Sequence, residues 1–421
     1  MSQKYTLHND AYTDFRAYLD GSYKGRDGEE VLGLSVGYPE PGEFPLPKVV
    51  LREMAAEIDG VEKPRPGYGW DAGSTPLREN LVKLENLLHG THYAIGNICM
   101  VAGATYAFNR VLETLFLHDP GKKLLVVAPT YYRMLYKAQY YAQVYNVVGR
   151  EENQFQVTVE DVLETLEENT KAIFLANPTN PTYIYYDNAF LERLISELEK
   201  RKVYLIIDES GDAFHLGTGP NRLRRYTDKL DNPYVIRIVT ASKKYLYAEY
   251  RIGYVLAGLS FMGNKQGGFI KDIGDDIGNA PLAINDALLK ISEQEISLIE
   301  QPSLAENSEF YDRMNANNKK MSYLKDLAKQ KLKSCPYVTN IIEPDANFNI
   351  TFKIDLKCYR RDIDFFQEFL EKKHISILPC SGLGIPAELM YFRLTYGIKE
   401  DRLLHGLDQL IDFINQKAVA S

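Results

Sequence analysis

The chain has 421 residues, 45% of them hydrophobic and 25% charged, and its formal net charge is −8 at pH 7. A chain of this length exceeds what one small core usually organises, so we expect two or more domains or a large α/β enzyme. The acidic balance argues against nucleic acid as the main partner, which would favour a basic face.

The four cysteines are widely scattered, with neither metal-ligand spacing nor the density of a disulfide scaffold. The seven histidines show no ligand spacing either, so no metal is predicted. We expect buried thiols in a reducing compartment. No apolar segment reaches transmembrane length, and the N-terminus has no apolar core of signal-peptide length. These features predict a cytoplasmic protein without a membrane partner.

The N-terminal part of the chain is irregular. Residues 1–30 are polar and rich in tyrosine, and we expect an arm with a short helix. Residues 31–47 read as a short strand followed by Pro/Gly turns. The stretch STPLRENLVKLENLLH then predicts a helix, with Thr75 as its N-cap, Pro76 in the first position and four leucines at helical spacing.

From about residue 97, strands and helices alternate. Short apolar runs such as KLLVVAPT, KAIFLANP and VYLIIDES end in small or polar residues, and helical stretches such as NAFLERLISELEKRK lie between such runs. This alternation is typical of βαβ units and predicts an α/β fold with a mostly parallel sheet. After about residue 285 two long helices and a smaller α+β region follow.

The residues that end the apolar runs are the first candidates for a site, because ligands bind outside the carboxyl ends of the strands in open α/β sheets. In VAGATYAF, Gly103, Ala104 and Thr105 lie between a strand and a helix, where free N–H groups and the helix dipole could bind a phosphate. Packing alone also explains small residues in such a turn. Tyr131, in APTYY, could stack on a flat ligand or simply be one tyrosine among 30.

Three further strand ends carry polar groups. NPTNPTY predicts a rigid turn that presents the Asn180 amide, because the residue before proline is driven from the helical region. Asp208 ends the buried run YLIIDES and needs a partner there, although a helix N-cap or a structural ion pair would also serve. Lys243 ends the run VIRIVTASK, where desolvation would lower its pKa and leave a nucleophilic amine.

These groups together suit one cofactor. Lys243 could form a Schiff base with an aldehyde, and Arg251, eight positions later, could bind a phosphate. An aldehyde, a phosphate and a protonated pyridine ring describe pyridoxal phosphate.

The order and spacing of these motifs, from SVGYPEPGEFP near residue 35 to FRLTYG near residue 393, resemble the aspartate aminotransferase family, class I and II, of fold-type I pyridoxal-phosphate enzymes. The resemblance implies a large three-layer cofactor domain over residues 46–300 and a small α+β domain over 301–421. Residues 1–45 would form an N-terminal arm and part of the small domain. It also implies amino-acid and 2-oxo-acid substrates and a homodimer.

Residue roles follow from the resemblance. It implies that Lys243 holds the cofactor as a Schiff base and moves the proton. It assigns the cofactor phosphate to Arg251, Thr240 and the loop Gly103, Ala104 and Thr105. Tyr131 would stack on the pyridine ring, Asn180 would bind the ring oxygen, and Asp208 would pair with the protonated ring nitrogen.

The remaining assignments concern the substrate and the second subunit. Arg393 would bind the substrate α-carboxylate through a bidentate pair, with Gly37 beside that carboxylate. Tyr68 would reach the phosphate of the partner subunit's cofactor.

Three positions depart from the family pattern. The family often has a tyrosine three residues after the aspartate, contacting the ring oxygen, but this chain has Gly211. Glu249 replaces a small residue before Arg251, and Lys244 places a second amine beside Lys243. We expect Lys244 to face outward or to contact a linker. The departures keep open lyase, cyclase or oxidase chemistry on the same scaffold, and a non-catalytic cofactor-binding regulator is a remote alternative.

The substrate side chain is open. Asp272, Asp275 and Asp276 occupy the region where aspartate-specific members place an arginine, so a cationic substrate would suit them if one faces the pocket. A solvated acidic loop is the more ordinary explanation, because exposed carboxylates are the usual state. The tyrosines at 131, 132, 245 and 247 could instead favour an aromatic or apolar substrate.

Overall fold

The computed structural model describes most of the chain. The described residues are 31–40, 42–59, 72–119, 121–215, 226–246, 248, 251–263, 268–277, 285–305 and 308–419. The predicted arm at residues 1–30, Tyr68, Tyr247, Glu249 and the side chains of Asp275 and Asp276 lie outside this part.

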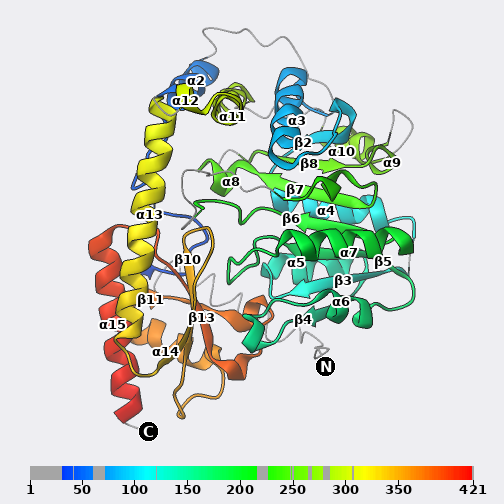
Figure 1. The fold of residues 1–421 in the computed structure, drawn as a ribbon. Helices are drawn as coiled ribbons and strands as arrows, with labels where there is room; N and C mark the ends of the chain where they lie inside the picture. Colours follow the sequence, from blue (N-terminus) through cyan, green and yellow to red (C-terminus); the bar gives the residue numbers. More distant parts are fainter. Residues whose placement is uncertain are drawn as a thin grey trace.

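A seven-stranded sheet forms the larger half of the molecule (Figure 1). Its order is β2 (Ile98–Val101), β8 (Gly253–Ala257), β7 (Val235–Thr240), β6 (Tyr204–Asp208), β5 (Thr170–Ala176), β3 (Lys123–Ala128), β4 (Gln143–Val148). Strands β3 to β7 pair in parallel, and only β8 runs antiparallel to its neighbours β2 and β7. The prediction of a mostly parallel sheet is confirmed.

Both faces of the sheet are covered, which explains why its strands read as continuous apolar runs. Along β3, Leu124 and Val126 join the core beneath α4 (Ala104–Phe116), together with α5 (Tyr132–Lys137) and α10 (Phe269–Ile277). The alternate residues Leu125 and Val127 join the core of the opposite face, beneath α6 (Val159–Thr165) and α7 (Asn188–Arg201). The sheet is therefore the middle of three layers.

Further helices pack at the β2 end of the sheet. They are α2 (Lys48–Asp59), α3 (Thr75–His89), α8 (Ala241–Lys244), α9 (Leu259–Met262), α11 (Asn285–Glu300) and α12 (Pro302–Ala305). Helix α3 begins one residue earlier than predicted, with Ser74 at its N-cap and Pro76 in its first turn, and Gly90 ends it at a φ of 75°. It packs against β2 and α11.

A smaller sheet lies beside the first. Its order is β12 (Leu378–Pro379), β13 (Tyr391–Thr395), β10 (Asn349–Ile354), β9 (Val338–Ile342), all antiparallel. Next to it β1 (Leu32–Gly33) pairs in parallel with β11 (Ile375–Ser376). Helices α13 (Glu309–Lys333), α14 (Asp362–Lys373) and α15 (Glu400–Val419) share a core with this sheet, and α13 runs along one side of the molecule (Figure 1). The domain boundaries at residues 45 and 300 stay a prediction.

Short 3₁₀ helices fill several connections. They are η1 (Ile95–Asn97), η2 (Ala138–Tyr140), η3 (Glu151–Asn153), η4 (Asp228–Asp231), η5 (Cys380–Leu383) and η6 (Ala387–Leu389).

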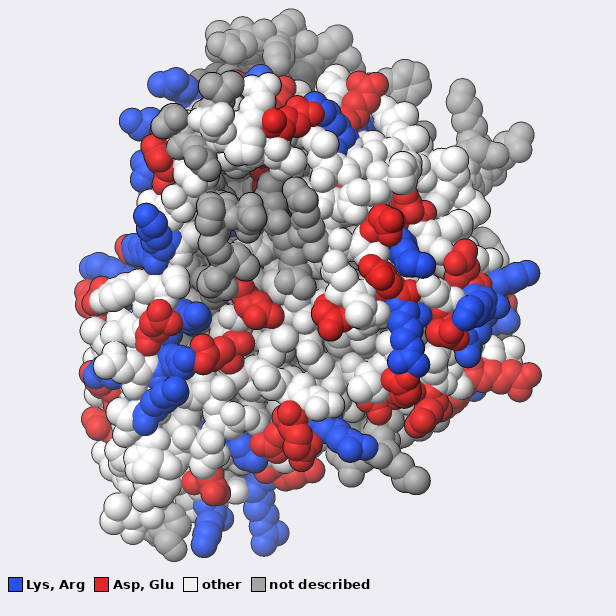
Figure 2. Space-filling view, in the orientation of Figure 1, with Lys and Arg blue, Asp and Glu red and all other residues white. Residues whose placement is uncertain are grey.

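The surface carries both signs of charge (Figure 2), and three of the four cysteine thiols are buried. Figure 2 shows positive and negative side chains interspersed on one face of the molecule. Cys99, Cys335 and Cys380 are buried, whereas Cys358 is exposed, so the expectation of buried thiols is wrong for Cys358. Among the described helices, none has the length and apolar character needed to cross a membrane.

Candidate active site

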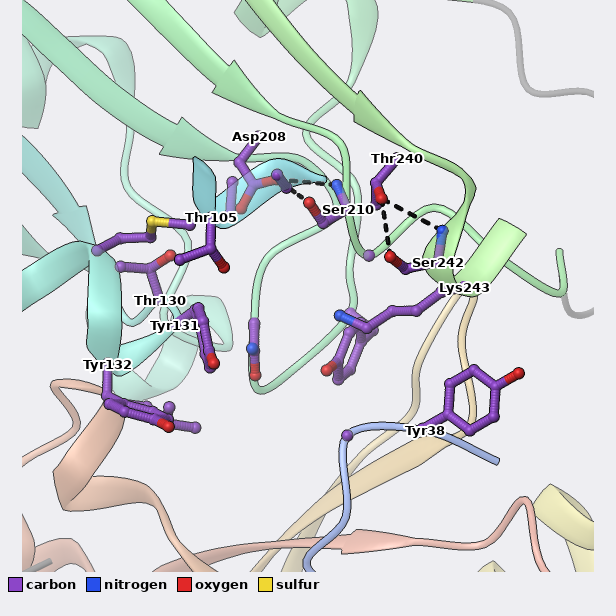
Figure 3. A pocket seen from close by; sticks show the side chains of 18 of the residues that line it. Tyr38, Thr105, Thr130, Tyr131, Tyr132, Asp208, Ser210, Thr240, Ser242 and Lys243 are labelled. Atoms are coloured by element: carbon purple, nitrogen blue, oxygen red, sulfur yellow. Dashed lines mark hydrogen bonds between the residues drawn. The ribbon is translucent and has the colours of Figure 1, made fainter. Parts of the chain in front are cut away.

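A cavity of about 280 Å³ opens at the carboxyl ends of the parallel strands, where β3, β5, β6 and β7 meet the smaller sheet (Figure 3). The sequence-predicted residues that line it are Gly37, Ala104, Thr105, Tyr131, Asn180, Asp208, Thr240, Lys243, Arg251 and Arg393. Gly103 lies directly against Arg251. The structure thus brings together the described residues to which the resemblance assigned the cofactor and the substrate carboxylate.

Lys243 extends from helix α8 into this cavity. The helix starts at the end of β7, where Thr240 is the N-cap and its hydroxyl accepts from the Ser242 N–H at 3.2 Å. The Lys243 side chain points toward the wall that carries Tyr131 (Figure 3), and its amine has no hydrogen-bond or ion-pair partner among the described residues. Burial lowers the pKa of Lys243 to about 8, although the charge of Asp208 opposes the shift. More of this amine is neutral near pH 7 than in an ordinary lysine.

Asp208 ends strand β6 and is 6% exposed. Its Oδ1 accepts from the Ser210 N–H at 2.9 Å and from the Ser210 hydroxyl. Burial raises the pKa of this carboxyl above its usual value, while the bonds from Ser210 and the charge of Lys243 counter the shift. Its other oxygen accepts no hydrogen bond from the described residues, so a protonated ring nitrogen in the cavity would satisfy it.

Arg393 enters the cavity from strand β13. Its Nη1 donates to Asn180 Oδ1 at 3.1 Å, and its Nη2 donates to the Ser35 carbonyl at 3.0 Å. Its Nε is buried without a hydrogen-bond partner. A buried donor left unpaired is costly, and a carboxylate suits the edge of a guanidinium. Asn180 directs its oxygen to the arginine, so its NH₂ group is left for a ligand.

The start of α4 forms a cradle with Arg251. Gly103 is the N-cap with a φ of 82°, and Ala104 and Thr105 follow in the first turn. A Cβ at position 103 would lie 2.5 Å from Arg251 Nη2, so only glycine lets the guanidinium approach the helix end. Free N–H groups, the positive helix end and a guanidinium fit a phosphate dianion.

Aromatic rings form the wall opposite Lys243 (Figure 3). Tyr131 is the N-cap of α5, and its ring meets that of Tyr132 edge to face at a centroid distance of 4.6 Å. Burial raises the pKa of Tyr131, so its phenol stays neutral. Next to it, the Thr130 hydroxyl is buried without a partner. This wall offers a flat apolar surface and a spare polar group to a planar ligand.

A separate cluster of charges lies behind the strand ends. Glu209 binds Arg237 through two bonds of 2.6 and 2.8 Å, and Arg237 Nη1 binds Glu85 Oε2 at 2.7 Å. Tyr254 donates to Glu85 Oε1 at 2.6 Å. Burial works against the charge of Glu85, but Arg237 and His89 lower the pKa of that carboxyl below its usual range. We call the Glu85, Arg237 and Glu209 side chains the buried ion network.

Lys244 also lies behind the strand ends and does not line the cavity. Its side chain is 13% exposed and lies 3.5 Å from Glu295 Oε2 on α11, which also accepts from the Tyr245 hydroxyl at 2.5 Å. Burial lowers the pKa of Lys244, but Glu295 and Tyr254 raise it further, and the net shift is upward. The expectation that Lys244 faces outward is wrong, because a buried carboxylate holds it inside.

The other departures have separate outcomes. Gly211 lines the cavity. Asp272 lies on α10, where its Oδ2 accepts from the Thr114 hydroxyl at 2.7 Å, and it does not line the cavity. Sequence reasoning missed Ser35, Tyr183, Ser210 and Ser242, which all line it. Ser242 directly precedes Lys243 and Ser210 lies two residues after Asp208, and that proximity is the signal that could have found them.

The described residues therefore fit pyridoxal phosphate. The cradle at Gly103 suits its phosphate, the open oxygen of Asp208 suits its ring nitrogen, and the unpaired Lys243 amine suits its aldehyde.

Comparisons with known proteins agree with this chemistry. The sequence profile of the family described as aminotransferase class I and II matches residues 29–410. An aspartate aminotransferase of Thermotoga maritima is 25% identical over 95% of this chain and 96% of its own length. An S-alkyl-thiohydroximate lyase of Arabidopsis thaliana is 22% identical over 94% of this chain and 82% of its own length.

Solved structures share the fold. An aspartate aminotransferase variant from Thermus thermophilus has a TM-score of 0.77 at 18% identity, covering 97% of this chain and all of its own. An aromatic aminotransferase from Pyrococcus horikoshii has a TM-score of 0.75 at 18% identity, covering 92% of this chain and 96% of its own. The chain belongs to the class I and II aminotransferases, pyridoxal-phosphate-dependent enzymes that move an amino group from an amino acid to a 2-oxo acid.

Proposed function

We propose that Lys243 is the residue that carries the cofactor and moves the proton at the substrate α-carbon in this aminotransferase. The observation that carries the proposal is its enclosed amine, which has no partner among the described residues and faces the same cavity as Asp208 and Arg393. Pyridoxal phosphate, when bound, supplies an aldehyde that joins amino groups and a ring that takes up electrons from a bond broken at that carbon.

Each neighbouring residue then has a defined task. Asp208 keeps a proton on the ring nitrogen, because its open oxygen is held dry at the end of β6. Arg393 binds the substrate carboxylate through its unpaired edge, which orients the α-carbon toward Lys243. With a pKa near 8, Lys243 can take a proton as the neutral amine and return it as the ammonium.

The cofactor is held at its two other ends. The loop Gly103, Ala104 and Thr105 binds the phosphate together with Arg251 and the Thr240 hydroxyl. Tyr131 stacks on the ring, and the NH₂ group of Asn180 binds the ring oxygen. Gly37 lines the cavity near Arg393 and leaves room for the substrate carboxylate.

We further propose that the enzyme works as a homodimer in the cytoplasm, with Tyr68 completing the phosphate site of the partner subunit. The resemblance of the motif around Tyr68 to its family supports this. Sedimentation of the enzyme as a monomer in solution would contradict it.

Borohydride reduction of the purified yellow enzyme, followed by peptide mapping, tests the proposal. We expect the label on Lys243 and none on Lys244, which Glu295 keeps protonated. A label elsewhere, or no label, would overturn it.

The reaction type is tested by spectroscopy. Adding candidate amino acids should convert the cofactor to its aminated form, and a 2-oxo acid should convert it back. Oxygen consumption or elimination products without this reversal would point to the lyase or oxidase alternatives.

A further inference from the structure

Tyr183 has an unusual backbone for its position in the cavity wall. It follows the turn NPTNPT with a φ of 56°, in the left-handed region, and its side chain is 1% exposed. Bulky residues rarely adopt this conformation, and such outliers gather at functional sites.

The phenol of Tyr183 lies among the proposed catalytic groups. Arg393 Nη1 donates to the Tyr183 hydroxyl at 3.3 Å, and the same nitrogen donates to Asn180 Oδ1 at 3.1 Å. The phenol oxygen and the Asn180 amide are therefore within two hydrogen-bond lengths of each other. That oxygen accepts from Arg393. Burial raises the pKa of the phenol, whereas the Asn349 side chain also hydrogen-bonds it and lowers its pKa, so the proton of the phenol itself remains to be donated.

Gly211 explains why a tyrosine fits at position 183. A Cβ added to Gly211 would lie 3.4 Å from Tyr183 Cδ1 and 3.1 Å from Pro178 Cγ. The ring of Tyr183 thus occupies the space beside Gly211 into which a larger side chain at position 211 would grow. The tyrosine that the family resemblance leads one to expect at 211 is missing, and a phenol from the neighbouring turn stands beside that place.

We propose that Tyr183 contacts the cofactor and donates its hydroxyl proton to the ring oxygen, in place of the tyrosine that position 211 lacks. This inference rests on the proposed function of the site. With this contact, Arg393, Tyr183 and the ring oxygen form one chain of hydrogen bonds. A substrate carboxylate bound to Arg393 would therefore alter the polarity of the cofactor ring.

Tyr183→Phe tests the contact, because it removes the hydroxyl and keeps the ring. A donor to the ring oxygen stabilises negative charge there, and that charge holds the proton on the nitrogen that joins Lys243 to the cofactor. Without the donor the proton is held more tightly. We expect the pKa of the bound cofactor's visible absorption to rise by about one to two units, as for loss of a hydrogen bond to a charged group.

Tyr186→Phe is the matched control. Tyr186 is equally buried, and its hydroxyl accepts from the Val157 N–H at 3.2 Å in the apolar core on the other face of the sheet. The control should lose a comparable amount of stability and leave the pKa of the absorption unchanged.

An exchange of residues provides the second test. Tyr183→Gly should raise the pKa of the absorption, and Gly211→Tyr alone should crowd the Tyr183 ring. The double variant Tyr183→Gly/Gly211→Tyr should bring the pKa back toward that of the unaltered enzyme, because the phenol then comes from the neighbouring segment.

The outcomes separate the two proposals. If cofactor stays attached to Lys243 in Tyr183→Phe and the pKa of its absorption is unchanged, the role of Tyr183 is overturned and the proposed function stands. If the unaltered enzyme fixes no cofactor at Lys243, both are overturned.

Discussion

Two regions of the molecule, the cavity and the buried charges behind the strand ends, differ in whether their charged side chains are paired within the protein. Asp208 and Lys243 face the cavity, where each keeps a polar group that the described residues do not pair. Their immediate neighbours Glu209 and Lys244 turn to the rear, where Arg237 and Glu295 pair them. Two chemically equal pairs, each one residue apart in sequence, thus have opposite surroundings.

The difference follows from what each region must do. On the rear side a buried charge must be paired within the protein, or the folded state loses stability. On the cavity side the protein leaves a carboxylate oxygen, an amine and a guanidinium edge unpaired, and it accepts shifted pKa values there. Unpaired charge in a cleft is therefore the better marker of function than buried charge as such.

Replacing Lys243 and Lys244 one at a time should give the largest difference between the two regions. Lys243→Ala should lower kcat by about 10³-fold or more, because it removes both the cofactor attachment and the proton carrier. Lys244→Met should instead leave Glu295 without its cation and mainly lower the free energy of unfolding. Steady-state kinetics and urea denaturation of both variants measure the contrast. Equal loss of activity in the two would contradict it.

The neighbouring carboxylates Glu209 and Asp208 give a second contrast between the two regions. Arg237→Met leaves Glu209 and Glu85 buried without their cation, so we expect a loss of about 3–5 kcal/mol in the free energy of unfolding. Asp208→Asn keeps the shape of the side chain and removes only the charge. It should cost little stability but raise the activation free energy by about 2–5 kcal/mol, seen in kcat/KM. A destabilised Asp208→Asn protein would count against the division of roles.

Gly103→Ala should weaken cofactor binding by about tenfold to hundredfold. The new Cβ would displace the Arg251 guanidinium, and the φ of 82° disfavours alanine. Gly90→Ala is the control, since Gly90 has a φ of 75° and no atom closer than 3.8 Å to the new Cβ. Titration of the cofactor-free proteins should show weaker binding for Gly103→Ala alone.

The last prediction concerns pH. The folded enzyme without cofactor gives up the Lys243 proton near pH 8, whereas the unfolded chain keeps it to about 10.5. Between these values the unfolded state binds more protons, so stability rises with pH, and below pH 8 the cost of the buried charge is fully present. Denaturation across this window, with Lys243→Met as reference, should show a more positive slope of stability against pH in the unaltered protein than in the variant.

Most of this site could be predicted because apolar runs that end in polar residues mark the carboxyl ends of strands in the sequence. Apolar runs that stop at Asp208, Thr240 or the residues before Thr105 mark one edge of the sheet, and the structure brings these residues to one cavity. The large parallel sheet follows from the same runs, although strand β4 and the helices α5 and α6 were not foreseen.

The errors came from partners distant in the chain. Lys244 is held by Glu295 on α11, and no local pattern reveals that ion pair. The place of Tyr183 depends on the missing side chain at Gly211, which lies 28 residues further along the chain. Burial among residues from separate segments is a property of the folded chain, so neither position could be read from spacing.

Residues 32–36 are tied to the far end of the chain: β1 pairs with β11, the Thr395 N–H donates to the Leu34 carbonyl at 2.7 Å, and Ser35 accepts from Arg393. Deleting this short segment would leave the elements around Lys243 intact but remove the Ser35 carbonyl that holds the Arg393 guanidinium in place. Such a shortened protein should still turn yellow with the cofactor, yet fail to distinguish amino acids from simple amines.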